Sequence, residues 1–441
     1  MRLRDTAKDL FLATLHRLRI SEVMRSRIKH EEETLHLGEL VYSMQSFRRV
    51  IVISVGKAAA PMWDSLLPVI EPTLRRGQSI DAIVIGATRP QRDDSRVAYF
   101  HGSHPFPDQT ARDAADAILN LLAACDETCL VIFLVSGGAS AMVEKALDNR
   151  MTVEDEAMFH KALVRSGLPI TQMNALRKHF SQVKGGRLAV VAQGATQCTL
   201  LVSDVPEKML HIIGSGPSLP DPSTVQECRQ IIHENLESLN LPDKILEFFS
   251  DPDCEETPTA DHPAFEKASW FSLLSSEDLY KSAGELADRD GFHVVVDNSC
   301  DDWDYRDAAT YLLDRLWELR GHHRRVCLLS AGEVSVQIPA AHGSGGRNQQ
   351  FVLECARQIV GRGLSATVLS GGSDGVDGDS PAAGAVCDET TFERAAENEL
   401  DLVAALESFD SFTVFSKLGD AIVTGPTGNN VRDLRILLSE T

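Results

Sequence analysis

Short, unbroken runs of apolar and β-branched residues recur along the first half of this sequence, and longer segments with helical periodicity separate them. Four of these runs, at residues 50–55, 82–85, 130–135 and 199–202, have the length of strands. A strand that is apolar on both faces is typical of a parallel sheet that helices cover on both sides. The pattern therefore predicts an α/β domain with a Rossmann-like parallel sheet and flanking helices, whose ligands bind beyond the carboxyl ends of the strands.

The chain has 441 residues, more than one hydrophobic core usually organises, which indicates two domains. A loop-like stretch rich in Pro, Asp, Glu and Thr marks the boundary. We expect an N-terminal domain over residues 1–250, a linker over 251–268 and a C-terminal α/β domain over 269–441. In the C-terminal domain, strands are expected at 269–274, 293–296, 326–330 and 367–369, and helices at 276–290, 305–320 and 348–360.

Glycine-rich loops end several of the expected strands. Three of them are SGGAS at 136–140, the end of the segment 201–217, and SGGSDGVDG at 370–378. Glycine allows backbone N–H groups to approach an anion closely, and a helix start adds positive dipole. One such loop could simply turn a strand into a helix, but their recurrence indicates a polyphosphate site. The loop residues expected to bind ligand are Gly56, Ser136, Gly137, Gly138, Ser140, Gly214, Gly216, Gly345, Gly346, Gly371 and Gly372.

Neither of the two common nucleotide-binding motifs accompanies the first strand. Gly56 and Lys57 follow this strand, but no glycine stands five residues before Gly56, and no Ser or Thr follows Lys57, as a Walker A loop requires. The G-x-G-x-x-G fingerprint is also missing. Binding of NAD therefore loses its main support in the sequence.

The net charge is −21, with 64 acidic and 43 basic residues. This balance argues against a nucleic acid or an anionic membrane as partner. An acidic protein that handles anionic substrates must concentrate its useful cations locally. Lys57, the basic segment 174–189 and Arg347 are the candidates.

The basic segment 174–189 (NALRKHFSQVKGGRLA) has helical spacing that places Lys178 on one face, with Arg177 and Lys184 close beside it. This face could bind phosphate or carboxylate, or it could be a solvated basic surface. We expect Lys178 and Lys184 to bind ligand. His179 faces away from the cluster, which indicates a packing or hydrogen-bonding role.

Arg347 stands at the start of an expected helix, after the sequence GSGG and before Asn348, and Glu333 closes the strand-end sequence SAGE. A guanidinium beside free N–H groups would bind a carboxylate or phosphate through two hydrogen bonds. A structural salt bridge is the alternative, but an arginine at this end of a helix opposes the helix dipole. We therefore expect Arg347, Asn348 and Glu333 to belong to the site.

Four aspartates at strand ends could hold Mg²⁺ or orient a hydroxyl. They are Asp204, Asp374, Asp377 and Asp379, and their spacing is not that of an EF-hand loop. The alternative is that they cap turns, which we expect of one or two of them.

No apolar run reaches the roughly 18 residues of a membrane-spanning helix. Residues 1–30 have the pattern of a charged amphipathic helix without the apolar core of a signal peptide. The nine cysteines lack the spacing of a zinc site or a disulfide framework. We expect a cytoplasmic protein without a membrane or nucleic-acid partner, present as a monomer or a homodimer.

Taken together, the motifs resemble the glycerate 2-kinase family, whose C-terminal half is the domain called MOFRL. They follow in order from residue 54 to about residue 425, so the resemblance spans most of the chain. The motifs are VGKAA, SGGASAM, NALRKHFSQVKGGRLA, LVSDVP with IGSGPSLPD, SAGE with GSGGRNQQ, and SGGSDGVDGDSPAAGAV. The resemblance implies two α/β domains, the second of MOFRL type, with the active site in the cleft between them.

The family phosphorylates D-glycerate at its 2-hydroxyl with ATP and Mg²⁺, so the resemblance implies that this chain forms 2-phospho-D-glycerate and ADP. The family's proposed catalytic lysine and arginine fall on Lys57 and Arg347. Asp204 or Asp374 would hold Mg²⁺, and Asp204 is also a candidate catalytic residue. Gln350 stands where family members often carry glutamate, which puts a metal role for that position in doubt. The alternatives are a hydroxypyruvate reductase, a name also attached to this family, and a non-catalytic sugar-phosphate-binding protein.

Overall fold

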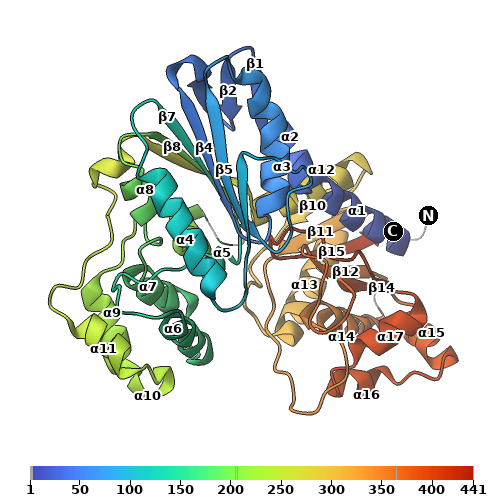
Figure 1. The fold of residues 1–441 in the computed structure, drawn as a ribbon. Coiled ribbons are helices and arrows are strands. Elements are labelled where there is room, and N and C mark those ends of the chain that lie inside the picture. Colours follow the sequence, from blue (N-terminus) through green and yellow to red (C-terminus); the bar gives the residue numbers. More distant parts are fainter. Residues whose placement is uncertain (1–2, 204, 206, 364, 441) are drawn as a thin grey trace. The chain divides into compact units, whose positions relative to one another are not determined.

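The computed structural model describes residues 3–203, 205, 207–363 and 365–440. They form two compact units. The central unit comprises Val23–Leu273, and the terminal unit combines the chain up to Glu22 with the chain from Leu274 onward. In Figure 1 the terminal unit includes both the dark blue start of the chain and its orange to red end.

The central unit is built on a six-stranded sheet with the order β6-β5-β4-β7-β8-β9. Its pairs from β6 to β8 are all parallel, and Val52 of β4 lies between Ala82 of β5 and Ile132 of β7. All four predicted strands and their parallel pairing are therefore confirmed. The strands are β4 (Arg49–Val55), β5 (Ser79–Gly86), β6 (Val97–His101), β7 (Cys129–Val135), β8 (Thr196–Val202) and β9 (Ala268–Leu274). A separate antiparallel sheet joins β1 (Ile28–Glu31), β2 (Thr34–Leu37) and β3 (Leu40–Ser43).

Helices cover both faces of the six-stranded sheet. Ile51 and Ile53 of β4 pack with the apolar side chains of α4 (Gln109–Leu122), α5 (Ala139–Met142) and α8 (Arg187–Val191). The opposite face carries α3 (Ala59–Ile70), to whose first carbonyl the Ser54 hydroxyl donates a hydrogen bond. This arrangement explains why the central strands are apolar on both sides. The unit also contains α2 (Ile20–Arg27) from Val23 onward, η1 (Met44–Ser46), η2 (Glu71–Thr73), η3 (Glu207–Ser215) and η4 (Pro263–Phe265).

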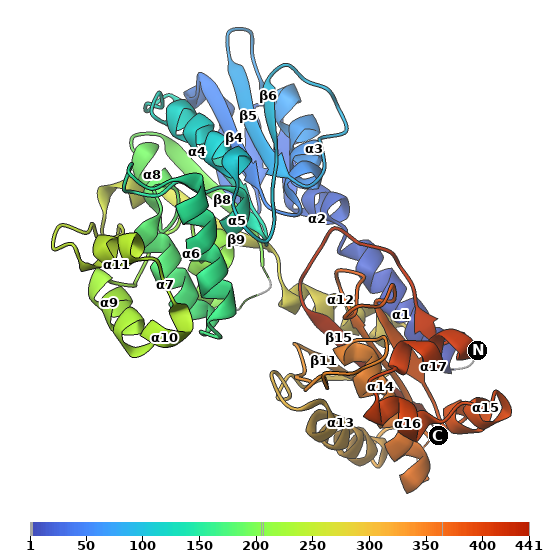
Figure 2. The ribbon, with the colours of Figure 1, turned by 60° about the horizontal axis from the view of Figure 1, so that its bottom comes forward.

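A group of helices with its own apolar core extends from this sheet, as Figure 2 shows in green and yellow-green. Phe159, Phe180 and Phe249 meet in this core. The helices are α6 (Val153–Arg165), α7 (Ile170–Phe180), α9 (Val225–Glu234), α10 (Leu236–Leu239) and α11 (Asp243–Ser250). A capping box between Thr152 and Asp155 starts α6. No helix within the described residues combines the length and apolar character needed to cross a membrane.

The terminal unit is built on a mixed six-stranded sheet with the order β10-β11-β15-β12-β13-β14. The last strand of the chain, β15, lies between β11 and β12 and is antiparallel to both. The predicted strands at 293–296, 326–330 and 367–369 are confirmed, whereas the central position of β15 was not predicted. The strands are β10 (His293–Val296), β11 (Arg325–Ala331), β12 (Thr367–Gly372), β13 (Gly384–Cys387), β14 (Ala421–Ile422) and β15 (Asp433–Glu440).

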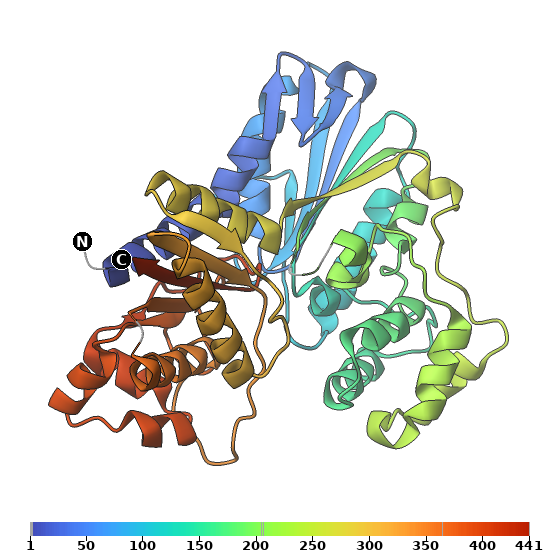
Figure 3. The same ribbon diagram turned by 180° about the vertical axis from the view of Figure 1, so that it is seen from behind.

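Helices also cover both faces of the terminal sheet. The core of one face joins α13 (Tyr305–Arg320) and α14 (Arg347–Arg362) to β11, β12 and β15. On the other face lie α1 (Leu3–Arg17) and α12 (Ser276–Arg289), which are in contact and visible side by side in dark blue and yellow in Figure 3. The remaining helices are α15 (Thr391–Glu397), α16 (Leu402–Glu407) and α17 (Ser411–Leu418).

The compact units divide the chain differently from the predicted domain over residues 1–250, because α1 belongs to the terminal unit. Its apolar stripe includes Leu10 and Phe11, which are buried. Phe11 packs on β12 at Gly371, where a Cβ would lie only 2.6 Å from Phe11 Cζ. The single helix predicted over residues 1–30 is also divided, since α1 ends at Arg17 and α2 begins at Ile20.

The predicted second boundary is also displaced. The strand expected to open the C-terminal domain is β9, which instead forms the edge of the central sheet beside β8. The backbone N–H of Gln197 in β8 donates to the carbonyl of Lys267, the residue before β9 (2.9 Å). An apolar run alone does not reveal which of two sheets it joins, and the change from one unit to the other follows β9 instead of preceding it.

The packing of α1 predicts that Phe11→Ala destabilises the terminal unit by about 3–5 kcal/mol, since it empties a buried aromatic site. Denaturant unfolding followed by tryptophan fluorescence measures this loss. Leu12→Ala is the matched control on the same helix, because Leu12 is exposed, and it should change the stability by no more than about 0.5 kcal/mol. Equal effects of the two substitutions would contradict the assignment of α1 to this unit.

Candidate functional site

The turns that follow β4 and β7 in the central unit interlock. The Lys57 N–H donates to the Gly137 carbonyl (2.9 Å), and the Ala58 N–H donates to Ser136 Oγ (3.0 Å). Gly56 has a φ of +118°, and a Cβ there would lie 2.4 Å from Ser136 Oγ. Only glycine fits at this position. The structure thus brings together two loops that the sequence predicted separately.

The outer side of the second turn is open. Among the described residues, no hydrogen-bond acceptor takes the backbone N–H of Gly137 or Gly138. A Cβ at Gly137 would meet no atom within 4 Å. Adjacent unpaired N–H groups beside open space form a concavity that suits an anion.

Lys57 lies over this second turn. Its Cγ would be 3.3 Å from a Cβ at Gly138, and the side chain is exposed. Within the described residues, no carboxylate approaches the Lys57 ammonium to within 4.0 Å. Burial, together with the charge of Lys57, lowers the pKa of the neighbouring His104. Lys57 is therefore a cation that an anionic ligand could reach.

A third predicted loop joins the site through hydroxyl groups. The Oγ atoms of Ser140 and Ser215 are 2.8 Å apart, and Ser215 donates to Asn174 Oδ1 on α7 (2.8 Å). Gly214 and Gly216 both have a φ of +58°, and a Cβ at Gly216 would lie 2.4 Å from a carbonyl oxygen. The two glycines shape the loop, and the hydroxyls connect it to α7.

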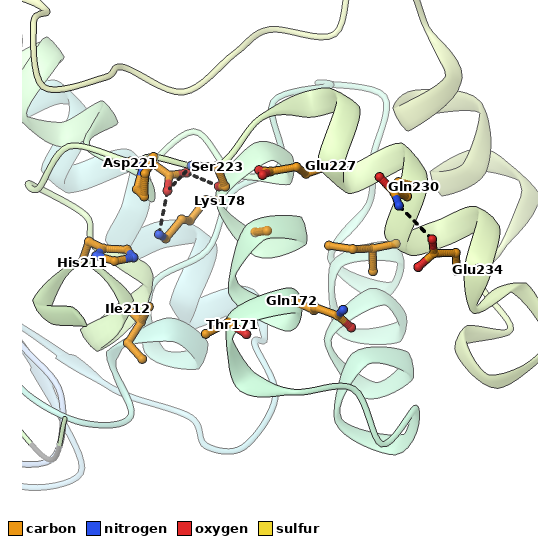
Figure 4. A pocket seen from close by; sticks show the side chains of 13 residues that line it. Thr171, Gln172, Lys178, His211, Ile212, Asp221, Ser223, Glu227, Gln230 and Glu234 are labelled. Carbon is orange, nitrogen blue, oxygen red and sulfur yellow. Dashed lines mark hydrogen bonds and ion pairs between the residues drawn. The ribbon is translucent and has the colours of Figure 1, made fainter. Parts of the chain in front are cut away.

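Lys178 borders a cavity of about 460 Å³ between α7 and α9, but it is already paired. Its ammonium donates to Asp221 (2.8 Å), and Figure 4 shows the two side chains pointing toward each other with His211 nearby. Burial alone would raise the pKa of Asp221, but the charge of Lys178 holds it below the usual range. Asp221 also accepts a hydrogen bond from Thr257 (2.9 Å). The predicted ligand contact of Lys178 would require this pair to open.

Lys184 is buried, and its ammonium donates to Glu144 (2.7 Å) and to the Val143 carbonyl (2.8 Å). Glu144 also accepts a hydrogen bond from His160 Nε2 (2.5 Å). Burial alone would raise the pKa of Glu144, but Lys184 and His160 bring it down to about 2. Removing Lys184 from this enclosed pair would leave a buried carboxylate without its cation. In the structure Lys184 is the cation of this buried pair, and its ligand contact stays a prediction.

Two histidines of this region serve packing. His179 is buried and bonds to the Ala175 carbonyl (3.0 Å) and to Glu256 (3.1 Å), which confirms its predicted hydrogen-bonding role. Burial lowers the pKa of His160 to about 4, so this side chain is neutral at pH 7.

Arg347 opens α14 in the terminal unit, as predicted, and has two carboxylate partners. Its Nε and Nη2 donate to Asp433 (2.6 and 3.2 Å), and its Nη1 donates to Glu333 (2.7 Å). Burial raises the pKa of Glu333. Three of the five N–H groups of the guanidinium are thus engaged, and two remain for a ligand. The salt bridge that the sequence offered as the alternative is present.

The N-terminus of α14 is capped by Asp377. This buried carboxylate accepts the backbone N–H groups of Asn348 (3.0 Å) and Gln349 (2.8 Å) and both of their side-chain amides. Burial raises the pKa of Asp377 to about 6, although these hydrogen bonds oppose the rise. Gly346 is required because a Cβ there would lie 2.3 Å from Asp377 Oδ1. Asp377 thus occupies the place that an anionic ligand was predicted to take.

Other residues of these loops also have structural partners. Asp379 accepts the Gly345 N–H (2.9 Å), so the capping alternative is correct for Asp377 and Asp379. Gly371 makes room for Phe11, as described above. Gln350 is buried and donates to the Leu406 carbonyl (2.7 Å). A ligand contact for the glycines of the terminal unit stays a prediction.

Two carboxylates lie near Gly372. A Cβ there would be 3.1 Å from Asp374 Oδ1 and 3.3 Å from Asp433 Oδ1. Carboxylate oxygens suit Mg²⁺, which keeps several of its waters. The part of the chain that the structure describes contains no cluster of three metal-ligating side chains. Asp204 lies outside the described residues, so its predicted roles stay predictions.

Sequence reasoning missed the residues that neutralise the predicted cations. Asp433 lies 86 residues from Arg347, and Glu144 lies 40 residues from Lys184. Asp221 is the last residue of the motif IGSGPSLPD, but the sequence does not show that it pairs with Lys178. The position of Asp433 at the start of an apolar strand was the one signal that could have placed it at a sheet edge.

Two family models match the chain, one described as "Domain of unknown function (DUF4147)" over residues 6–250 and the MOFRL family over residues 326–433. The chain is 30% identical to the D-glycerate 2-kinase of Thermotoga maritima, over 88% of this chain and 90% of that protein. It is 32% identical to a putative hydroxypyruvate reductase of Agrobacterium vitis, over 88% of this chain and 99% of that protein.

The fold is similar to the crystal structure of a glycerate kinase from Thermotoga maritima, with a TM-score of 0.82 and 27% identity over 99% of each chain. Both the matching family models and the similarity along most of the sequence support one assignment. The chain belongs to the glycerate 2-kinase family. The family and the two-part α/β fold predicted from the motifs are therefore confirmed.

The buried pair of His160 and Glu144 predicts a pH dependence of stability. His160 has a folded pKa of about 4, below its ordinary value of 6.5, so the unfolded chain binds the additional proton between these values. Stability is therefore lost as the pH falls through this window, by about 1.4 kcal/mol per pH unit for one proton. Glu144, with a folded pKa of about 2, adds a further loss below about pH 4.5.

Denaturant unfolding at pH 7, 6 and 5 measures the slope, and His160→Gln should reduce it by about one proton. Arg177, Lys184 and Glu144 are the charged groups that face His160, and none of them titrates in this range. His233→Gln, on an exposed histidine of α9, is the control and should leave the slope unchanged. An unchanged slope in His160→Gln would show that His160 is not held neutral.

Proposed function

We propose that this protein is an ATP-dependent kinase that phosphorylates D-glycerate at its 2-hydroxyl. The observation that carries the proposal is Lys57, an ammonium without a carboxylate partner among the described residues, above a turn with two open N–H groups. It lies in a chain that is similar along most of its length to a D-glycerate 2-kinase. Binding and orienting a polyphosphate is the main task of a kinase site.

Residues of each unit have a proposed part in the reaction. Lys57 and the N–H groups of Gly137 and Gly138 bind phosphate oxygens and stabilise the charge of the transferred group. Arg347 contacts the glycerate carboxylate through its two remaining N–H groups. Its ion pairs with Asp433 and Glu333 fix the direction of the guanidinium.

We also propose that the reaction requires Mg²⁺, held by Asp204 or Asp374. The ion would offset charge on the β- and γ-phosphates. Support comes from the position of Asp374, which follows the end of β12 by two residues. A net charge of −21 supports small-molecule substrates rather than nucleic acid as partners. A cytoplasmic location and a monomeric or homodimeric state complete the proposal.

Hydroxypyruvate reduction is the second candidate, because a relative named as a putative hydroxypyruvate reductase is 32% identical to this chain. A reductase would bind a nicotinamide cofactor. After β4, however, the sequence has a single glycine at Gly56 in place of the G-x-G-x-x-G fingerprint. This difference favours the kinase.

We expect the protein to release ADP from ATP in the presence of D-glycerate and Mg²⁺, and EDTA to abolish the release. Phosphorus NMR of the product should show coupling to one methine proton, as a phosphate on C2 requires. Hydroxypyruvate with NADH or NADPH is the parallel assay. Substantial NAD(P)H oxidation without ADP release would contradict the kinase, and coupling to two methylene protons would place the phosphate on C3.

Arg347→Lys should raise the KM for D-glycerate and lower kcat/KM roughly ten- to a hundredfold, because lysine keeps the charge but loses the planar fork. The KM for ATP should change much less. Steady-state kinetics with each substrate varied in turn separates the two effects.

Asp433→Asn is the control, because it weakens the same ion pair and leaves the charge of Arg347 in place. If both variants lose only thermal stability, Arg347 has a structural role. A rise in the KM for ATP alone would assign Arg347 to the nucleotide.

A further inference from the structure

Arg177 is a buried arginine whose side chain has no partner in the described part of the protein. It lies on α7, is 8% exposed, and forms no hydrogen bond or ion pair there. Its Nε is fully enclosed without an acceptor, whereas its two terminal amino groups are not fully enclosed. A ligand could thus contact the terminal amino groups of the guanidinium, although it could not contact Nε. Burial lowers the pKa of Arg177, and Glu144 is the charge that opposes this.

The charges around Arg177 do not balance. Glu144 and Glu156 contribute two negative charges, Lys184, Arg177 and the Arg112 that pairs with Glu156 contribute three positive ones, and His160 is neutral at pH 7. Both oxygens of Glu144 are occupied, one by Lys184 and His160 and the other by the Lys145 N–H. The group therefore has one positive charge in excess, and an unpaired buried charge is strongly unfavourable.

The position of Arg177 connects this excess charge to the glycine-rich loops. Arg177 follows Asn174 by one turn on α7, so the two side chains share a face of the helix. Asn174 bonds to Ser215, and Ser215 bonds to Ser140 of the SGGAS loop. The same loop carries the open N–H groups of Gly137 and Gly138.

We infer that Arg177 binds an oxyanion of a substrate, a carboxylate or phosphate oxygen, in the central unit. This inference rests on the proposed function and deepens it, because it names the cation of the basic segment that contacts substrate. Lys178 and Lys184 of that segment are neutralised by Asp221 and Glu144. An arginine whose N–H groups lack an acceptor can donate hydrogen bonds to two oxygens of one anion at once.

The test combines stability with binding in Arg177→Met and Arg177→Lys. Without substrate, Arg177→Met should have an equal or higher Tm than the unsubstituted protein, because it removes an unpaired buried charge. Its affinity for D-glycerate or for ATP, measured by calorimetry, should fall roughly ten- to a hundredfold. Arg177→Lys should lose affinity with little change in Tm.

Arg187→Met is the matched control, since Arg187 is also largely enclosed but is paired with Glu255 (3.2 Å). This variant should lower the Tm and leave both affinities unchanged. Loss of D-glycerate binding assigns Arg177 to the carboxylate, and loss of ATP binding assigns it to a phosphate; either result supports the inference. Unchanged affinities in both Arg177 variants, or an unsubstituted protein that binds neither ligand, overturn it.

These measurements distinguish failure of the Arg177 inference from failure of the proposed kinase function. If the unsubstituted protein binds D-glycerate through Arg177 but releases no ADP, the kinase is wrong and the oxyanion site stands. If ADP is released at an unchanged rate and with unchanged KM values in both Arg177 variants, the kinase stands and the inference fails.

Discussion

The close approach of two backbone turns is the constraint on which the central site depends. Ser136 leaves no room for a Cβ at Gly56, and the first turn donates two hydrogen bonds to the second. The N–H groups of Gly137 and Gly138 have no acceptor among the described residues. Lys57 then extends over them from the first turn. One steric contact thus determines both the shape and the charge of the proposed phosphate site.

Much of the fold could be predicted from the sequence, because parallel strands that are buried on both faces stand out as unbroken apolar runs. Val50–Val55 and Leu130–Val135 fell within observed strands. The membership of α1, β9 and β15 could not be predicted in this way. Each of these elements has an apolar face that either unit could bury, and only tertiary packing, such as Phe11 on Gly371, makes the choice.

The site was predictable in its backbone and less so in its charges. Glycines that allow close approach can be recognised from local sequence. Whether a cation is available to bind a ligand depends instead on whether a carboxylate far away in the sequence pairs with it. Lys178 and Lys184 looked as available as Arg177 in the sequence, but Asp221 and Glu144 neutralise the first two. In the terminal unit, Asp377 likewise satisfies the helix start that appeared open to a ligand.

The position of β15 has a consequence for synthesis of the protein on the ribosome. The central unit is complete in sequence at Leu273, and domains generally fold as units while the chain emerges. The sheet of the terminal unit cannot form before β15 is made, because β11 and β12 are joined only through this strand. Until then α1, which is made before the central unit, has no finished sheet to cover. Two segments that flank the central unit in the sequence therefore pack together only after that unit has been made.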